Sequence, residues 1–431
     1  MKFQLATEKT TLDNGLRVLT CAMPHTYSVG VGFYLSVGSR YEEASTAGAA
    51  HFLEHMIFKG TEKRPSPEAI AVELEGNGGL FNASTGLETT ILWAKMQQGH
   101  LSLAIDILSD MLRNSLLVQE EIEKERRVIL EEISSSQDIP DELVGLVARE
   151  FTWPDHPLGW DVAGTPESVA GLARETLEAF LDTHYNPKNL VLSVAGDIQH
   201  DEVVDLAHSR LGDWQTGLIS DFLPAPKNGT DPAATVVTRK VEQTHLQLHL
   251  PGISRLDRDR YHLALLNVIL GEGMSSRLFL DVRERLGLAY AVDSYISFLA
   301  DTGVIGVYAA VNPEKVDEAL HAILVQLQRL RDEQVEEKTL NAAKEYVKGR
   351  LLMSMEDTLS VAGWGGRQEI QGGPIDSVEQ TLEQVRGITV EDLQSAADRL
   401  FKPEGARLAI VGPHKEADAA HFNSILNNGT F

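Results

Sequence analysis

Two histidines four residues apart, with a glutamate beside the second, are the residues of this chain best suited to chemistry. They occur as His51, Glu54 and His55 in AGAAHFLEHMIFKGT, residues 47–61. An α-helix turns by about 100° per residue, so both imidazoles would lie on one helix face with the carboxylate next to them. Two neutral imidazoles can share a zinc ion, and a nearby carboxylate can take a proton from water. The pattern alone also fits a helix that simply has a polar face.

A third metal ligand has to come from another part of the chain, because a catalytic zinc has three protein ligands and one open position. Residues 117–138, LVQEEIEKERRVILEEISSSQD, predict an acidic amphipathic helix. Glu125 and Glu132 are seven residues apart and therefore lie nearly on one line of that helix, while Glu131 is turned away by about 100°. Most of these charges are expected to be solvated. The pattern leaves Glu131 and Glu132 as alternatives.

The two halves of the chain repeat one pattern. The stretch GLARETLEAFLDTHYNPKNLVLSVAGDI begins at Gly171, and GITVEDLQSAADRLFKPEGARLAIVGPH begins at Gly387, an offset of 216 residues. Both predict an N-capped amphipathic helix, a turn with proline and a β-branched strand that ends in glycine. An offset of half the chain length indicates a duplicated domain, because solenoid repeats have much shorter periods. At this offset the matching pairs are Gly171 with Gly387, Glu175 with Glu391, Leu177 with Leu393, Tyr185 with Phe401, Pro187 with Pro403 and Gly196 with Gly412.

The remaining patterns predict the fold class. Strand-like alternation occurs early in each half, as LRVLTCAM and VGVGFYLSVG in the first and HLQLHL in the second, and helical patterns follow. One helix is predicted in SPEAIAVELEG, with Ser66 as its N-cap, Pro67 in its first turn and Gly76 at its end. Strands that are grouped rather than strictly alternating with helices favour an α+β fold. We therefore expect two homologous domains, each an antiparallel-rich β-sheet packed with helices.

The duplication also predicts the domain boundaries and which of the two domains binds metal. We expect an N-terminal zinc-binding domain over residues 1–216, a linker over 217–234 where Pro, Gly, Asn and Asp cluster, and a C-terminal domain over 235–431. The positions that lie 216 residues after the two histidines and Glu132 are Asn267, Gly271 and Lys348. No second H-x-x-E-H occurs near them, so only the first half is expected to bind metal.

Composition excludes several classes of function. The 431 residues carry a net charge of −25, which argues against binding the phosphates of nucleic acid. No apolar run approaches the roughly 18 residues that a membrane span needs. The first residues resemble neither a signal peptide nor a transit peptide, so a cytoplasmic location is expected. Cys21 is the only cysteine, which rules out a cysteine-based zinc site.

The segment GAAHFLEHMIFKGT is similar to the signature of the M16 metallopeptidases, the family of pitrilysin, insulin-degrading enzyme and the β subunit of the mitochondrial processing peptidase. The resemblance implies that His51, His55 and Glu132 bind one Zn²⁺ per chain and that Glu54 is the catalytic base. It favours Glu132 over Glu131, because Glu125 and Glu132 have the spacing of the family helix. The resemblance further implies that Glu125 supports the metal ligands.

Two more segments resemble the family where it contacts substrate. GNGGLFNASTGLETT, residues 76–90, is similar to an edge strand of the active site, which implies that Asn82 and Ala83 contact the substrate backbone. GEGMSSRLFLDVRERLGLAYAVDS, residues 271–294, resembles an element in which an arginine and a tyrosine seven residues apart bind substrate. By that resemblance Arg283 and Tyr290 bind the peptide and assist catalysis.

These resemblances predict a zinc-dependent endopeptidase that cleaves peptides or unfolded protein segments inside a closed chamber. Family members of this length commonly pair, and this chain carries both the zinc motif and the Arg–Tyr pair, so we expect a homodimer. Two alternatives differ in kind: a non-catalytic M16-like structural subunit, and a peptidase that is active only with a separately encoded partner chain.

Overall fold

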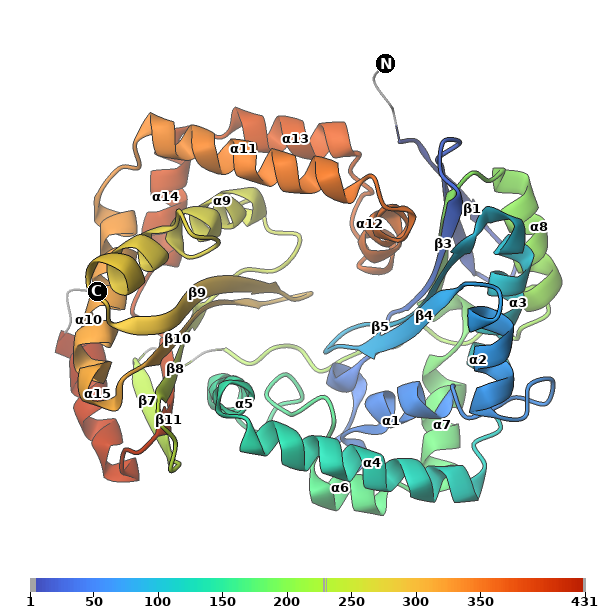
Figure 1. Cartoon of the computed structure of the whole chain (residues 1–431), viewed down its shortest axis with the longest axis horizontal. Coiled ribbons are helices and arrows are strands. Elements are labelled where there is room, and N and C mark those ends of the chain that lie inside the picture. The colour runs from blue at the N-terminus through green and yellow to red at the C-terminus, as the bar shows by residue number, and fades with distance from the viewer. Residues whose placement is uncertain (1–4, 228, 230, 429–431) are drawn as a thin grey trace. The chain divides into compact units, whose positions relative to one another are not determined.

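The computed structural model describes residues 5–227, 229 and 231–428 (Figure 1). Asn228 and Thr230 of the expected linker lie outside the described residues. The chain divides into two compact units, and each unit is assembled from three segments. The first unit comprises Met1–Ile133, Asp161–Leu223 and Leu351–Glu379, and the second comprises Ser134–Trp160, Pro224–Arg350 and Gln380–Phe431. No helix among the described residues is long and apolar enough to cross a membrane.

A six-stranded sheet with the order β1-β2-β6-β3-β5-β4 forms the centre of the first unit. Its strands are β1 (Thr7–Thr11), β2 (Arg17–Ala22), β3 (Ser28–Leu35), β4 (Leu80–Thr85), β5 (Thr90–Gln97) and β6 (Leu190–Gly196). β2 and β6 run parallel, and the other neighbouring strands run antiparallel. The order places β4 at one edge of the sheet, where one side of its backbone pairs with no other strand among the described residues.

The second unit repeats this sheet in the order β7-β11-β8-β10-β9. Its strands are β7 (Ala233–Thr238), β8 (Thr244–Pro251), β9 (Ala289–Phe298), β10 (Gly303–Val311) and β11 (Arg407–Gly412). Here β7 and β11 run parallel, and the other neighbouring strands run antiparallel. The second order equals the first without β1, so the duplication extends to the topology. The expected α+β fold with two antiparallel-rich sheets is confirmed.

Helices cover both faces of each sheet. Those that lie wholly or mainly in the first unit are α1 (Ala49–Met56), α2 (Pro67–Glu75), α3 (Leu101–Asn114), α4 (Gln119–Asp138), α6 (Pro166–Gly171), α7 (Arg174–His184), α8 (His200–Leu211) and α12 (Thr358–Ile370). Those of the second are α5 (Pro140–Thr152), α9 (Arg260–Leu270), the π-helix η5 (Phe279–Arg285), α10 (Val316–Asp332), α11 (Glu337–Ser354), α13 (Val378–Gly387), α14 (Val390–Leu400) and α15 (Ala419–Asn428). Short 3-10 turns are η1 (Ser39–Tyr41), η2 (Ala44–Thr46), η3 (Gln98–His100), η4 (Pro187–Asn189), η6 (Pro313–Lys315) and η7 (Glu416–Asp418).

The predicted helix after Ser66 is present as α2. The Ser66 hydroxyl accepts a hydrogen bond from the Ala69 amide at 3.2 Å, Pro67 is the first helical residue and Gly76 is the C-cap. The side-chain oxygen satisfies one of the amides that the first turn of a helix leaves without an internal partner. The local sequence therefore determines where this helix begins and ends.

The two halves of the chain exchange one helix each. α5 belongs to the first half of the sequence but packs on β8 and β11 of the second unit, whereas α12 belongs to the second half and packs on β3 and β6 of the first unit. The starts of α5 and α12 are 218 residues apart, so they are equivalent elements of the duplication. The units therefore differ from the contiguous domains 1–216 and 235–431 that we expected. α4 and α11, the long helices that precede α5 and α12, each cross from one unit into the other.

Side-chain alternation along the strands explains why each sheet needs the exchanged helix. Strand residues alternate between faces, so β3 places Val31 and Phe33 in the main core of the first unit and Tyr34 on the opposite face. α12 covers that opposite face. A Cβ at Gly366 of α12 would lie 2.3 Å from the Tyr34 ring, so glycine is required for this close approach. Without the exchanged helix, the second apolar face of the sheet would be exposed to water.

A buried histidine connects the exchanged helix α5 to the second sheet. His249 of β8 contacts the Thr152 hydroxyl of α5 through Nδ1 at 2.8 Å and the Tyr295 hydroxyl of β9 through Nε2 at 2.8 Å. Burial is the largest cause that lowers the pKa of His249, to about 3, and the charge of Arg149 acts in the same direction. The ring is therefore neutral in the folded protein over a wide pH range.

The neutral ring of His249 makes the second unit sensitive to acid. In the unfolded chain a histidine has a pKa of about 6.5, so below that pH the unfolded state gains a proton that the folded state excludes. The contribution of the neutral His249 ring to the free energy of unfolding is therefore fully present above about pH 6.5 and is lost as the pH falls toward 3. When the pH is lowered from about 7 to about 5, the free energy of unfolding of wild type should fall by roughly 2 kcal/mol more than that of His249→Gln. Urea unfolding at both pH values measures this difference. An equal loss in both proteins would contradict this account.

Candidate metal centre

The helix that carries both histidines begins at a glycine, and its N-cap hydrogen bonds come from elsewhere in the chain. Gly48, the N-cap of α1, has φ of 92° and no capping side chain, and a Cβ there would lie 2.6 Å from the Ala163 carbonyl oxygen. Glu42 caps the helix instead: its carboxylate accepts hydrogen bonds from the Gly48 amide at 2.8 Å and the Ala50 amide at 2.7 Å. Burial raises the pKa of Glu42 to about 8, and the two amide bonds oppose this rise.

The two faces of α1 have different roles. Phe52, Leu53 and Met56 are fully buried in the core of the first unit, whereas His51 and His55 lie on the partly exposed side. The apolar residues therefore fix the rotation of the helix about its axis. That rotation holds both imidazole rings on one side, as the spacing predicts.

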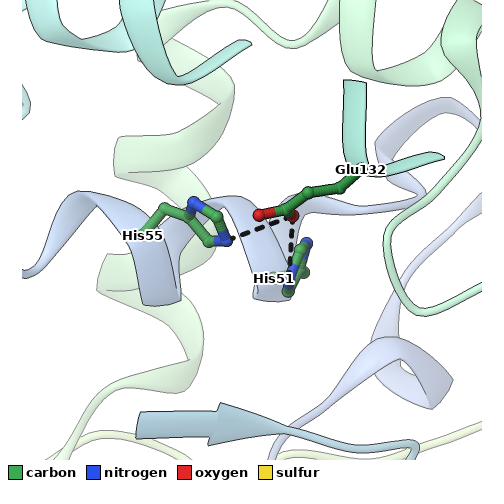
Figure 2. Close-up of side chains that lie close together, drawn as sticks. All are labelled: His51, His55 and Glu132. Carbon is green, nitrogen blue, oxygen red and sulfur yellow. Dashed lines mark ion pairs between the residues drawn. The ribbon is translucent and has the colours of Figure 1, made fainter. Parts of the chain in front are cut away.

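Glu132 of α4 meets both histidines (Figure 2). One ligand atom from each of His51, His55 and Glu132 lies within 4.8 Å of the others, and this is the only such group of three found among the described residues. The Glu132 carboxylate oxygen is 3.9 Å from His51 Nε2 and 3.6 Å from His55 Nε2. The alternative, Glu131, does not belong to this group.

Glu125, which precedes Glu132 by seven residues on α4, fixes the imidazole of His55. It is buried, at 7% exposure, and accepts a hydrogen bond at 3.0 Å from Nδ1 of His55. A proton on Nδ1 leaves the lone pair of Nε2 directed toward Glu132. The other Glu125 oxygen is 2.5 Å from the Lys59 ammonium. Glu125 therefore connects α4 to α1 and to the segment that follows α1.

The donor atoms fit a zinc ion. Burial lowers the pKa of His51 to about 4, with a further contribution from neighbouring His55, so this ring is neutral at physiological pH. Its Nδ1 is buried and has no hydrogen-bond partner in the described part of the chain. The distances from Glu132 to the two rings exceed those of a hydrogen bond. Two imidazole nitrogens and one carboxylate oxygen that face one another without a shared hydrogen bond are a typical ligand set for zinc.

Glu54 lies on the same helix, between the two histidines in sequence. Burial is the largest cause that raises its pKa above the ordinary glutamate value, while Thr85 at the end of β4 acts in the opposite direction. His55 and Glu132 are both close enough to influence the charge of Glu54. A carboxylate with a raised pKa is a better proton acceptor than an ordinary one near neutral pH.

The expected substrate strand lies beside these residues in the first unit. Asn82 and Ala83 belong to β4, which contacts α1 and, among the described strands, pairs only with β5. The Asn82 side chain accepts a hydrogen bond from the Ala83 amide at 2.9 Å. β4 is the last strand in the order of the described sheet, so one side of its backbone can pair with another extended chain.

Arg283 and Tyr290 belong to the second unit. Arg283 is on η5, Tyr290 is on β9, and the guanidinium carbon lies 5.7 Å from the centre of the Tyr290 ring. Tyr290 is 74% exposed as a residue. The structure thus brings these two predicted residues together on one surface, as it brings His51, His55, Glu132, Glu54 and Glu125 together in the first unit.

The equivalent positions of the second unit make ordinary structural contacts. Asn267 on α9 accepts a hydrogen bond from the Ser294 hydroxyl at 2.8 Å. Lys348 on α11 pairs with Glu345 at 3.0 Å. The described residues of this unit contain no group of three metal-ligating side chains.

Two residues of the site were not identified from the sequence. Lys59 follows His55 by four residues, so the spacing of α1 extended by one turn could have indicated a cation near Glu125. Glu42 has no local signal, because the carboxylate that caps α1 precedes Gly48 by six residues and is separated from it by a 3-10 turn.

Comparisons with known proteins identify the family of this chain. The family model described as "Insulinase (Peptidase family M16)" matches residues 17–166, and the model described as "Peptidase M16 inactive domain" matches residues 171–347. An uncharacterized zinc protease from Rickettsia felis is 38% identical over 94% of this chain and 97% of its own length. An uncharacterized zinc protease from Mycobacterium tuberculosis is 37% identical over 95% of this chain and 94% of its own length.

A solved structure has the same fold. A protease from Helicobacter pylori superposes with a TM-score of 0.90, at 24% identity, over 95% of this chain and all of its own. At that identity the superposition shows the fold alone. The names of the sequence relatives support a peptidase that uses zinc.

Replacing each of the two adjacent glutamates of α4 by glutamine tests the ligand set. Glu132→Gln should weaken zinc binding by at least about 100-fold, because it removes a ligand, and loss of a mere supporting partner already costs 10–100-fold. Glu131→Gln makes the same change in charge one position away and should leave the affinity unchanged. Competition with a chromophoric chelator measures both. Equal effects in the two variants would contradict the assignment of Glu132.

Proposed function

This chain belongs to peptidase family M16, and on that premise we propose that it is a zinc-dependent endopeptidase that cleaves peptides or unfolded protein segments. The observation that carries the proposal is the convergence of His51, His55 and Glu132 from two helices, with Glu54 next to them. These residues would bind one zinc ion per chain.

The roles of the side chains follow from their positions. A zinc ion in this site would supply Lewis acidity toward the scissile carbonyl and toward water. Glu54 accepts a proton from the attacking water and later transfers it to the leaving amine, a role that its raised pKa supports. Glu125 is buried, and by accepting the Nδ1 proton of His55 it would keep that ring in the tautomer that binds metal.

The substrate would bind as an added strand along β4. An extended peptide can use the unpaired backbone groups of an edge strand, and main-chain hydrogen bonds of this kind are independent of sequence. Asn82 and Ala83 would contact its backbone, since both lie on that edge. This mode requires an unfolded segment, which supports peptides rather than folded proteins as substrates.

Arg283 and Tyr290 would bind the same peptide and stabilise the oxyanion that forms during cleavage. The guanidinium and the phenol are both hydrogen-bond donors, and the Tyr290 side chain is exposed. We propose further that two copies of the chain pair to enclose the substrate in a chamber, in the cytoplasm. A chain that carries both the metal residues and the Arg–Tyr pair needs no second kind of subunit, which favours a homodimer.

Replacing the proposed base separates catalysis from metal binding. Glu54→Gln should lose nearly all cleavage of an unstructured peptide, because glutamine cannot accept the proton, while zinc stoichiometry stays at one per chain. Metal content is measured by atomic absorption on the same samples that are assayed. Cleavage by metal-replete Glu54→Gln at the wild-type rate would exclude this mechanism. Wild type that binds zinc yet cleaves nothing would favour a non-catalytic subunit or a partner-dependent peptidase.

Removing one hydroxyl tests the proposed role of the second unit. Tyr290→Phe should lower kcat/KM by about 100-fold, the usual cost of losing one donor to an oxyanion, without changing zinc affinity. Tyr27→Phe is a matched control, because Tyr27 is 94% exposed and belongs to the first unit. If the two variants had the same kcat/KM, Tyr290 would have no part in the reaction.

A further inference from the structure

A buried carboxylate at the metal centre is shared between a histidine and a lysine. One oxygen of Glu125 accepts the Nδ1 hydrogen bond of His55 at 3.0 Å, and the other lies 2.5 Å from the Lys59 ammonium. Only 9% of the Glu125 side chain is exposed, compared with 23% of the Lys59 side chain. Lys59 therefore provides the positive charge that compensates the buried Glu125 carboxylate.

The pairing matters because an unpaired buried charge is costly. A carboxylate withdrawn from water loses several kcal/mol of solvation, and removing one partner of a buried pair leaves the other uncompensated. Without Lys59, the Glu125 carboxylate would turn toward water and its hydrogen bond to His55 would weaken. His55 would then lose the contact that selects its tautomer and fixes its ring plane.

Lys59 belongs to a segment, residues 57–66, that backbone contacts hold in one conformation. The Lys59 amide donates to the Met56 carbonyl at 3.0 Å, which continues the turn of α1. Gly60 has φ of 130°, and a Cβ there would lie 2.8 Å from the Pro65 backbone, so the close turn requires glycine. The Leu116 amide donates to the Gly60 carbonyl at 3.1 Å. The segment is thereby attached to the residues just before α4, the helix that carries Glu125.

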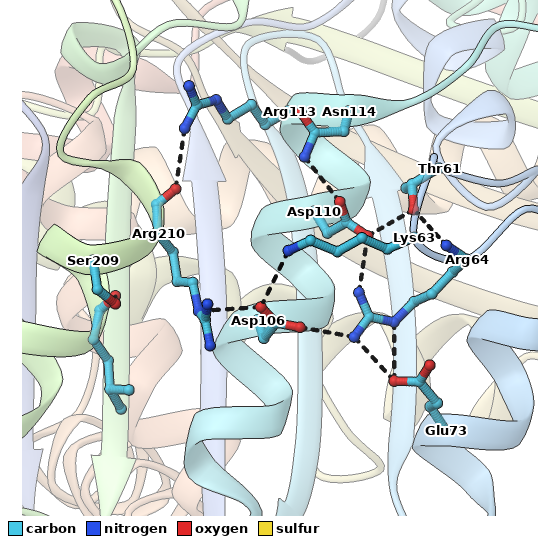
Figure 3. A network of polar contacts seen from close by, with 11 residues as sticks. Thr61, Lys63, Arg64, Glu73, Asp106, Asp110, Arg113, Asn114, Ser209 and Arg210 are labelled. Atoms are coloured by element: carbon cyan, nitrogen blue, oxygen red, sulfur yellow. Dashed lines mark hydrogen bonds and ion pairs between the residues drawn. The ribbon is translucent and has the colours of Figure 1, made fainter.

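A network of charges around the buried Arg64 fixes the far end of this segment (Figure 3). The Arg64 guanidinium, 5% exposed as a residue, contacts Asp110 at 2.8 Å and Asp106 at 2.7 Å, both on α3. It also contacts Glu73 of α2 at 3.0 Å. The Thr61 hydroxyl donates to Asp110 at 2.6 Å. The network attaches the segment to two neighbouring helices, so the backbone at Lys59 has little freedom to move.

We propose that Lys59 is a positioning residue of the metal centre: held by the 57–66 segment, it orients Glu125, and Glu125 in turn orients His55 for metal binding. This inference rests on the proposed function, since it assumes that His55 binds zinc. Lys59 is not one of the three side chains that would bind the metal, and its ammonium pairs with Glu125. Its effect should therefore appear in metal affinity and in the geometry of the metal site, and it should depend on Glu125.

The first test is zinc affinity, measured by chelator competition on the full chain. Lys59→Met should weaken zinc binding about tenfold, the lower end of the range for losing a partner of a metal ligand, and Lys59→Arg should restore most of it. Lys9→Met is the matched control, because Lys9 also pairs with a largely buried glutamate of the first unit, Glu369, at 2.6 Å. Lys9 lies on β1, at the opposite edge of the sheet from β4. The zinc affinity of Lys9→Met should stay within about twofold of wild type.

The second test distinguishes positioning from a general loss of stability. In a Glu125→Gln background, Lys59→Met should cause no further loss of zinc affinity, because Lys59 affects His55 only by orienting the Glu125 carboxylate. The visible absorption of the cobalt-substituted protein, which depends on ligand geometry, should change in Lys59→Met and not in Lys9→Met. Wild type that binds no zinc would overturn both this inference and the proposed function. Wild type that binds zinc with an affinity equal to that of Lys59→Met would overturn the inference alone.

Discussion

The hydrogen bond from the His55 ring to Glu125 connects the two helices that carry the proposed metal ligands. α1 provides both histidines and the proposed base, whereas α4 provides Glu132, and the two helices are separated in sequence by α2, two strands and α3. The bond is 3.0 Å long and its acceptor is buried. If it were broken, the side chains of α1 and α4 would still be present, but the lone pair of His55 would no longer be directed toward Glu132.

Contacts around this bond explain why α1 has one orientation. Glu42 satisfies the first amides of the helix, the apolar residues on its inner side fix its rotation, and the 57–66 segment attaches its C-terminal end to the residues before α4. These contacts use different parts of the chain and different forces. Together they hold two rings and a carboxylate close together, an arrangement whose electrostatic cost a bound cation would offset.

The sequence was informative wherever the chemistry is local. The spacing of His51, Glu54 and His55 predicted one helix face, and the seven-residue spacing of Glu125 and Glu132 predicted one line of α4, because helical geometry relates such neighbours directly. The exchange of α5 and α12 could not be predicted in this way. The apolar residues of an amphipathic helix show that it packs against another apolar surface. They do not identify which of two related sheets provides that surface.

The duplicated unit shows what the fold itself requires. The second unit keeps the strand order of the first, while Asn267 hydrogen-bonds Ser294 at the position equivalent to the first histidine. The side chains of the proposed metal site in the first unit are therefore not needed to form the sheet or its core. We attribute their presence to the proposed chemistry, and the contacts from Glu42 and Lys59 hold the helix that carries them.

A crystal structure of the zinc-loaded protein, with the metal located by anomalous scattering at the zinc edge, tests the ligand set most directly. We expect one anomalous peak per chain, about 2.0–2.2 Å from His51, His55 and Glu132, with Glu125 still bonded to Nδ1 of His55. A peak bound by Glu131 or by residues of the second unit, or no peak in protein equilibrated with zinc, would contradict this expectation.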